Sequence, residues 1–191
     1  MFMKTKPYNL PIFIIGAGSN LLVRDGGIPG VVIKLDSKSF KKMSLGNNTI
    51  TLGAGYRNKD LRKTLIEKGL GGLEFLCSIP GLVGGSVKTN AGCFGSEVKD
   101  VIVSATIVDG AGQKKTIGVD DLMLSYRSSF FPEDWIITSI TFKTYPDTAE
   151  NITAKLEEHK AYRMKNQPYN EKTAGSTFKN PEGLRAWELI K

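Results

Sequence analysis

Few side chains of this 191-residue sequence can perform redox, metal-binding or acid-base chemistry, because it has only two cysteines and one histidine. Cys77 and Cys93 have no CxxC spacing and no companion histidine, so we predict free thiols rather than a disulfide framework or a metal site. His159 falls in the middle of a predicted helix, where we expect an exposed residue rather than a catalyst. The sequence therefore offers no Ser-His-Asp set, no metal-ligand cluster and no Walker loop.

Long apolar runs are also missing. No run approaches the roughly 20 residues that a membrane helix requires. The first residues, MFMKTKPYNLPIFII, have a short apolar block and no small-residue cleavage site of the kind that ends a signal peptide. We therefore expect a cytoplasmic protein that does not bind a membrane.

Basic residues outnumber acidic residues. The sequence has 26 lysines and arginines against 19 acidic residues, a formal net charge of +7. A basic protein favours anionic partners such as a phosphorylated metabolite or a dinucleotide. The lysines are spread singly, with KSFKK as the one tight cluster, and no nucleic-acid recognition motif occurs, so we expect no nucleic-acid partner.

The hydrophobic pattern predicts a strand-rich α+β protein without internal repeats. A short buried strand is expected at 11–16 and further strands at 31–35, 49–55 and 135–145, with a hairpin at 101–119 that turns near Gly110 and Gly112.

Helices are expected at three places. One spans 58–69, with Leu61, Leu65 and Ile66 inward and Gly69 as its stop. A second spans about 149–165, with Asp147 and Glu150 as its capping box. The third begins after a linker at 165–175, with Asn180 as cap and Pro181 at the first helical position. A short helical turn leading into a loop is expected at 120–130.

Two glycine-rich stretches point to an anionic ligand. SIPGLVGGSVKTNAGCFG, residues 78–95, has five glycines interleaved with apolar residues, and GAGSN, residues 16–20, directly follows a predicted strand. Bare backbone lets amide groups converge on phosphates. Together the two stretches suit a ligand with a diphosphate and a flat apolar ring. The GxGxxG fingerprint is absent, and tight turns in a strand-rich fold are the alternative.

Two polar clusters accompany these stretches. SYRSSF places Arg127 among hydroxyl groups, where a guanidinium could hold a carboxylate or phosphate in bidentate fashion. GSTFKNP places Ser176 behind a glycine, with Lys179 and Asn180 following. The alternatives are a surface arginine and a helix-capping asparagine. The scarcity of catalytic side chains favours a cofactor for the chemical step.

Four segments in register resemble one family. IIGAGSNLLVRDGGIPGVVIKL, GLEFLCSIPGLVGGSVKTNAGCFG, SYRSSF and AGSTFKNP occur in the order and approximate spacing of the UDP-N-acetylenolpyruvoylglucosamine reductases, the MurB flavoenzymes of bacterial cell-wall synthesis. The resemblance covers roughly residues 12–191. It implies an α+β, FAD-binding, vanillyl-alcohol-oxidase-like fold. It also implies that NADPH reduces FAD, which then reduces the enolpyruvyl double bond of the UDP-sugar substrate to give UDP-N-acetylmuramate.

The resemblance also implies roles for individual residues. Arg127 would stabilise the charge that develops on the substrate carboxylate, and Ser176 would donate the proton. Tyr126, Lys179 and Asn180 would contact the substrate. The residues assigned to FAD are Gly16, Gly18, Ser19, Asn20, Leu21, Ile79, Gly81, Gly84, Gly85, Ser86, Asn90, Ala91 and Gly92.

The sequence departs from the family at both ends. Family members carry a further N-terminal segment and continue beyond AWELIK, where a glutamate helps the protonation step; no residue here matches it. We therefore expect residues 1–36 to be a remnant of the first FAD-binding subdomain, 37–165 the second, and 166–191 the start of an incomplete C-terminal substrate domain. Such a chain would bind FAD weakly or not at all and turn over negligibly.

Other functions stay open at this point. One alternative is a non-catalytic flavin- or nucleotide-binding remnant, another is a different flavin oxidoreductase of the same fold, and a third is a basic protein that binds a polyanion. The sequence carries no signal for an oligomeric state.

Overall fold

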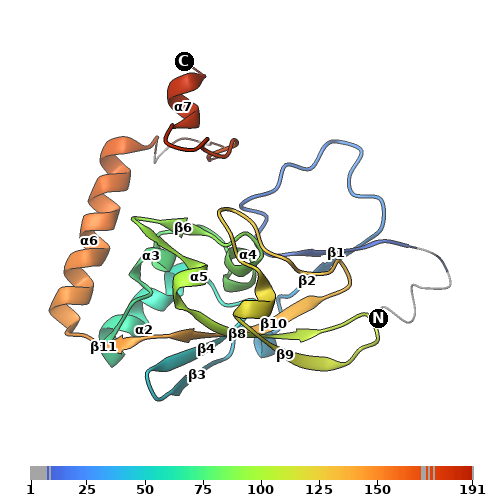
Figure 1. Ribbon diagram of the computed structural model, residues 1–191, viewed down its shortest axis with the longest axis horizontal. Helices are drawn as coiled ribbons and strands as arrows, with labels where there is room; N and C mark the ends of the chain where they lie inside the picture. Colours follow the sequence, from blue (N-terminus) through green and yellow to red (C-terminus); the bar gives the residue numbers. More distant parts are fainter. Residues whose placement is uncertain (1–7, 9, 169–170, 172, 174, 191) are drawn as a thin grey trace.

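A five-stranded antiparallel sheet forms the centre of the computed structural model, which describes residues 8, 10–168, 171, 173 and 175–190 (Figure 1). Its strand order is β3-β4-β10-β8-β9. The bounds are β3 (Met43–Gly46), β4 (Thr49–Gly53), β8 (Ile102–Val108), β9 (Lys114–Gly118) and β10 (Ile136–Lys143). The strands predicted at 49–55 and 135–145 and the hairpin at 101–119 are thereby confirmed.

Smaller strand pairs surround this sheet. β1 (Ile12–Ile15) and β2 (Val31–Lys34) form a separate parallel pair. β5 (Leu70–Gly71) pairs with β11 (Tyr145–Pro146), and β6 (Gly92–Cys93) pairs with β7 (Ser96–Glu97). The 15 residues between β1 and β2, numbers 16–30, form a long loop that extends away from the sheet in Figure 1.

The helices are short apart from one. They are α2 (Leu61–Lys68), α3 (Glu74–Cys77), α4 (Val83–Lys88), α5 (Val98–Val101), α6 (Ala149–Asn166) and α7 (Ala186–Leu189). Single 3-10 turns lie at η2 (Lys38–Lys41), η3 (Asn58–Asp60) and η4 (Asp120–Leu122). α6 packs on α2 and α3 through the buried Ile152 and Leu156. Gly69 closes α2 with a φ of 61°, as predicted.

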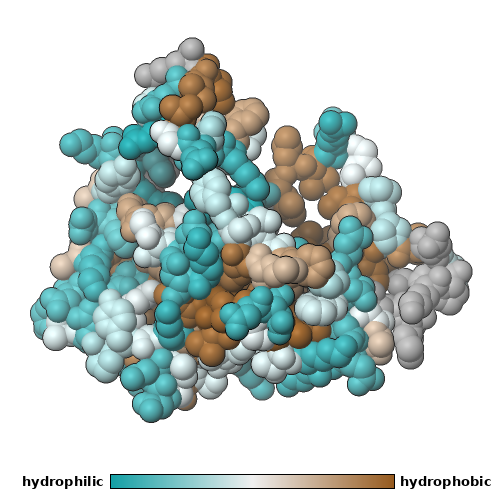
Figure 2. Space-filling view, in the orientation of Figure 1, coloured by the Kyte–Doolittle hydropathy of each residue, from teal (hydrophilic) through white to brown (hydrophobic). Residues whose placement is uncertain are grey.

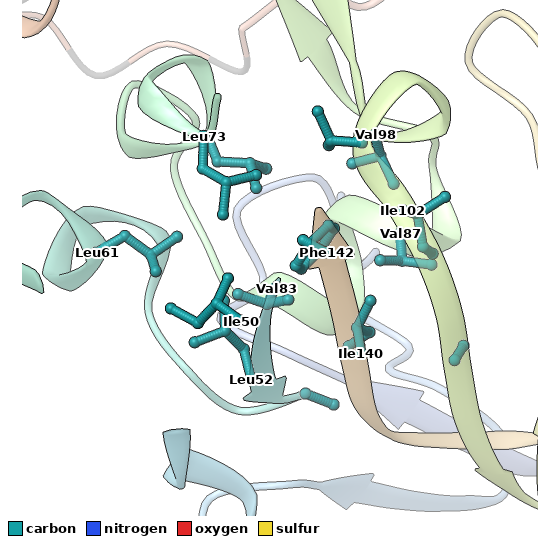
Figure 3. Packing of buried hydrophobic residues seen from close by; sticks show 14 of the residues in the cluster. Ile50, Leu52, Leu61, Leu73, Val83, Val87, Val98, Ile102, Ile140 and Phe142 are labelled. Carbon is teal, nitrogen blue, oxygen red and sulfur yellow. The ribbon is translucent and has the colours of Figure 1, made fainter. Parts of the chain in front are cut away.

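The core joins these helices to the sheet. Figure 3 shows Val83 and Val87 of α4 packed beside Phe142 and Ile140 of β10, and all four are almost fully buried. Burying such side chains is the main stabilising contribution to the fold. Because both valines are on its inner face, α4 is fixed on the sheet and the segments on either side of it are held in place.

Three sequence predictions about strands and helix starts need correction. The strand at 11–16 is not buried: Phe13 is 39% and Val32 of its partner strand 41% exposed, because a two-stranded ribbon shields little of its own surface. Thr148 caps α6 by accepting a hydrogen bond from the Asn151 amide, whereas Asp147 is engaged by Lys155.

The third correction concerns the C-terminal helix, which begins at Ala186 rather than Pro181. Residues 181–184 form a turn instead, closed by a hydrogen bond from the Leu184 amide to the Pro181 carbonyl. Asn180 nevertheless accepts a hydrogen bond from the amide of Ala186. Residues 1–7 and 9 and parts of the predicted linker lie outside the described residues. The three predicted subdomain boundaries stay predictions.

Candidate functional site

The two glycine-rich stretches meet in space. The Ser19 hydroxyl donates a hydrogen bond of 3.2 Å to the carbonyl of Pro80. A Cβ atom at Gly81, where φ is +113°, would lie 2.7 Å from the Ser19 Oγ, and one at Gly16 would lie 3.4 Å from the Leu82 side chain. Only glycine fits at Gly81 without a shift of its neighbour. We call residues 16–21 the first loop and residues 79–86, which include the start of α4, the second loop.

Asn58 holds the second loop from inside and was missed in the sequence. It is fully buried. Its side-chain amide donates to the Ile79 carbonyl (3.1 Å) and the Ser86 Oγ (2.8 Å), and its backbone amide donates to the Gly81 carbonyl (3.2 Å). Its Oδ1 has no hydrogen-bond partner among the described residues. An asparagine before a helix is typical of a cap, and nothing in the local sequence indicates contact with residues 79–86.

The neighbouring glycines of α4 face different surroundings. A Cβ atom at Gly84 would lie 2.9 Å from the Ala54 Cβ, and the Gly84 amide donates to the Ala54 carbonyl. The Val83 amide donates to Tyr56. These two amides are therefore occupied by the turn after β4. Gly85 is exposed, and a Cβ atom there would have nothing within 4 Å. The open face of α4 is thus at Gly85, where a flat group can approach the backbone.

The first loop carries apolar side chains into solvent. Leu21, Leu22 and Val23 are 55%, 93% and 49% exposed. Figure 2 shows the surface hollowed between the loop of residues 16–30 and the body of the protein, with hydrophobic atoms along the loop. Gly18, at φ +76°, has open space where a Cβ atom would be. Exposed apolar side chains beside bare backbone suit an apolar ring system with a polar extension.

Arg127 lies at the tip of a small hairpin. Ser125 and Ser128 exchange two backbone hydrogen bonds of 3.0 Å, which leaves Tyr126 and Arg127 as the turn residues. Arg127 has a φ of +53°, uncommon for a residue with a side chain. Its Nη2 donates to the Gly92 carbonyl (2.8 Å), and the guanidinium lies 5.4 Å from the centre of the Tyr126 ring. The structure thus brings Arg127 to the segment that follows the second loop.

Asn90 connects the end of α4 to that hairpin. Asn90 is fully buried with a φ of +41°. Its Nδ2 donates to the Glu97 carboxylate (2.9 Å) and the Ser125 carbonyl (2.7 Å), while its Oδ1 accepts from the Lys99 amide (2.9 Å). The Ala91 amide donates to the Ser86 carbonyl.

The last of the predicted site residues lie on the C-terminal segment. Ser176, Lys179 and Asn180 are exposed on the segment 175–190, whose helix α7 lies above the rest of the molecule in Figure 1. Within the described chain the structure gives no hydrogen bond between these three residues and the Arg127 hairpin. The predicted catalytic pair Arg127 and Ser176 is therefore not assembled by direct contact.

The single histidine and the two cysteines are partly buried. His159 was expected to be exposed, but it is half-buried and stacked on Phe94, with ring centres 3.9 Å apart, because the β6–β7 turn reaches α6. Burial lowers the pKa of His159. Both cysteines are free thiols. Burial raises the pKa of Cys77 to about 12 and also raises the pKa of Cys93.

Among the described residues, no three His, Cys, Asp or Glu side chains lie together as possible metal ligands.

Among the residues that the structure describes, no helix is both long enough and apolar enough to cross a membrane.

Comparisons with known proteins agree with this geometry. A family model described as FAD binding domain matches residues 4–118. The UDP-N-acetylenolpyruvoylglucosamine reductase of Paramagnetospirillum magneticum is 45% identical over 188 residues, 98% of this chain and 61% of that protein. That of Rickettsia conorii is 42% identical over 189 residues, 99% of this chain and 64% of that protein. The chain thus spans about three fifths of the length of the curated relatives it matches.

Solved structures show the same similarity. The crystal structure of UDP-N-acetylenolpyruvylglucosamine reductase (MurB) from Thermus caldophilus matches with a TM-score of 0.84 and 33% identity, over 100% of this chain and 69% of that one. Quinoline 2-oxidoreductase from Pseudomonas putida 86 matches with a TM-score of 0.58 at 15% identity, a likeness of fold alone. The predicted α+β fold of the FAD-binding type is therefore confirmed.

Proposed function

Because the chain belongs to the UDP-N-acetylenolpyruvoylglucosamine reductase family, we propose that it binds FAD in the cytoplasm and takes part in the NADPH-dependent reduction of a UDP-sugar enolpyruvyl group. The observation that carries this proposal is the meeting of the first and second loops at Ser19 and Pro80, together with the open backbone of Gly85 in the second loop. FAD as the cofactor agrees with the family model over residues 4–118.

The residues present fit this cofactor. The open faces of Gly18 and Gly85 give room for a diphosphate and a ring system, and the Ser19 hydroxyl already links the two loops that would hold them. The Leu21 amide donates a hydrogen bond to the Gly18 carbonyl and so closes a turn. Within the described chain, the amides of the two residues inside this turn, Ser19 and Asn20, donate to no backbone carbonyl. Such amides can hold phosphate oxygens. When bound and reduced, the flavin supplies a hydride to the β carbon of the enolpyruvyl group.

Arg127 would bind the carboxylate of that group. Its Nη2 is anchored on the Gly92 carbonyl, which leaves other N–H groups of the guanidinium for the substrate. As the carbon-carbon double bond accepts hydride, negative charge builds up on the carboxylate, and a fixed guanidinium stabilises it by about 3 kcal/mol or more. Tyr126, whose ring lies against the guanidinium, would border the same carboxylate.

Ser176 would complete the reaction by giving its hydroxyl proton to the α carbon and regaining one from water. A serine donates a proton only when it is positioned and shielded from solvent. Ser176 is exposed in the described structure, so the proposed role needs the segment 175–180 to cover the Arg127 hairpin when substrate is bound. Lys179 and Asn180 on the same segment would then contact the sugar nucleotide.

The test is a flavin titration followed by a substrate titration. The flavin absorption of the FAD-loaded chain is recorded during addition of UDP-N-acetylenolpyruvoylglucosamine, with UDP-N-acetylglucosamine, which lacks the carboxylate, as the matched ligand. We expect the enolpyruvyl sugar to perturb the flavin spectrum, Arg127→Ala to abolish the perturbation, and Arg24→Ala, on the exposed loop, to preserve it. Equal responses to both sugars would refute the proposed carboxylate site. Flavin binding without any response to either sugar would instead indicate a non-catalytic flavin-binding protein.

A further inference from the structure

The hairpin that carries Arg127 is fastened to one stretch of chain, residues 88–92. The Ser129 hydroxyl donates to the Lys88 carbonyl (2.6 Å), and Lys88 Nζ donates to the Phe131 carbonyl (3.0 Å). Asn90 Nδ2 donates to the Ser125 carbonyl, and Arg127 donates to the Gly92 carbonyl. Four hydrogen bonds therefore connect residues 88–92 with residues 125–131.

Asn90 differs from the other three donors because it is completely buried and fully engaged. Both hydrogens of its Nδ2 are used, one on Glu97 and one on Ser125, and its Oδ1 accepts from the Lys99 amide. A side-chain amide has two donors and an acceptor oxygen, so no hydrogen of Asn90 is left for a ligand. Its φ of +41° is a backbone conformation that asparagine tolerates better than most residues.

We infer that Asn90 is a positioning residue for Arg127 rather than a ligand of the cofactor. It clamps the Ser125 carbonyl at the base of the hairpin while Glu97 and the Lys99 amide of α5 hold Asn90 itself. The hairpin tip, where Arg127 is strained at a positive φ, is thereby held against Gly92. The part of this inference that concerns substrate rests on the proposed function; the part that concerns the hairpin does not.

The variant Asn90→Gly removes the side chain and keeps the positive φ accessible. The first readout is limited proteolysis with trypsin, followed by mass spectrometry, because trypsin cuts after Arg127 when the hairpin opens. We expect cleavage after Arg127 to become at least about tenfold faster, as the loss of a buried hydrogen bond to the hairpin implies. Cleavage after the exposed Lys179 should stay as in the wild type.

Two further variants keep this readout decisive. Ser129→Ala removes a different bond of the same attachment and should also raise cleavage after Arg127, by a smaller factor, even if Asn90→Gly folds poorly. Thr51→Val removes a part-buried hydrogen bond between Thr51 and Thr141 in the central sheet. It reports general loosening and should leave the relative rates at Arg127 and Lys179 unchanged.

Ligand binding supplies a readout that a purely structural role would not change. In Asn90→Gly, the dissociation constant for FAD should stay within about twofold of the wild type. The preference for UDP-N-acetylenolpyruvoylglucosamine over UDP-N-acetylglucosamine should fall as it does in Arg127→Ala. A residue that merely stabilised the fold would weaken the binding of both sugars by the same factor.

Several results would overturn the inference. One is unchanged cleavage after Arg127 in Asn90→Gly, and another is FAD binding weakened tenfold or more with the hairpin still protected, which would make Asn90 a cofactor ligand. The inference would also be refuted if Asn90→Gly and Thr51→Val changed both the cleavage after Arg127 and the affinity for FAD by similar factors. If the wild-type chain binds neither sugar, the proposed function fails, while proteolysis still decides the role of Asn90.

Discussion

Gly84 lies directly against Ala54: its amide donates a 2.9 Å hydrogen bond to the Ala54 carbonyl, and a Cβ atom at Gly84 would come within 2.9 Å of the Ala54 Cβ. The next residue, Gly85, faces open space. Two adjacent glycines on one helix therefore serve different purposes, one for packing α4 on the turn after β4 and the other for leaving a surface bare.

This difference predicts opposite effects of the same substitution. Gly84→Ala should destabilise the fold by about 1–3 kcal/mol, because α4 must move away from Ala54. Gly85→Ala should leave stability unchanged or raise it by about 0.5–1 kcal/mol, because alanine favours a helix. Thermal unfolding of the two variants beside the wild type measures both effects. Equal destabilisation by the two would contradict the packing of α4 described above.

Replacing Asn58 with aspartate, which has nearly the same shape, should destabilise the fold. In Asn58→Asp the two donors to Ile79 and Ser86 are lost, and a carboxylate takes the place of a fully buried amide. We expect a loss of about 2–4 kcal/mol in the free energy of unfolding, measured in urea. The control is Asn166→Asp, which removes a hydrogen bond to the Tyr162 carbonyl at an exposed position. A loss in the control as large as that in Asn58→Asp would show that burial does not set the effect.

Lys155 should be the main polar contact between α6 and the body. Its Nζ lies 2.9 Å from Asp147 and 3.3 Å from the nearly buried Glu74, and it donates to the Tyr145 hydroxyl. The hydrogen bond to Asp147 raises the pKa of Lys155 above its ordinary value. Lys155→Met would leave the Glu74 carboxylate with the Gly72 amide and cost about 1–2 kcal/mol.

The comparison for Lys155 is Arg62→Met, since Arg62 pairs with Glu157 at an exposed position between α2 and α6. Exposed ion pairs contribute little to stability. Chemical unfolding should therefore rank Lys155→Met as the more destabilised variant. The reverse order would mean that Lys155 does not hold α6.

His159 should make stability depend on pH near neutrality. Desolvation lowers the pKa of folded His159, against the opposing effect of the Glu158 and Glu74 carboxylates. A histidine with a lowered folded pKa stabilises the protein above its unfolded pKa of about 6.5, and that stability is lost as the pH falls through the folded pKa.

The matched variant is His159→Phe, which keeps a ring on Phe94 and removes the titration. Melting temperatures measured from about pH 7.5 to 5.5 should fall more for the wild type than for this variant. The pKa values of Asp109 and Asp147 are lowered, so the effect of these two carboxyl groups on the pH dependence of stability falls at more acidic pH than this range. Parallel curves for the two proteins would exclude His159 as the cause.

The sequence predicted those parts of the fold whose signals are local. Glycines mark both loops and the end of α2, and alternation with apolar residues marks β4, β8 and β10. The bond of Asn58 to Ile79 joins residues 21 positions apart and that of Asn90 to Ser125 joins residues 35 positions apart, and local patterns carry no information about them. The α6 cap was predicted one residue too early: Thr148 caps the helix, while Asp147 accepts hydrogen bonds from the side chains of Asn151 and Lys155.

Retention of flavin tests the central claim most directly. The purified chain is incubated with FAD, freed of unbound flavin and examined by absorption spectroscopy, beside Gly85→Leu and Leu45→Ala, a variant at an exposed position of β3. The sequence led us to expect weak FAD binding or none, but the two loops meet in the structure, so we predict a flavin band in the wild type and in Leu45→Ala. In Gly85→Leu, affinity for FAD should fall at least about tenfold, because a side chain fills the open face of α4, while its melting temperature is unchanged. No flavin band in the wild type, or equal affinity in Gly85→Leu, would contradict the claim that FAD lies between the two glycine loops.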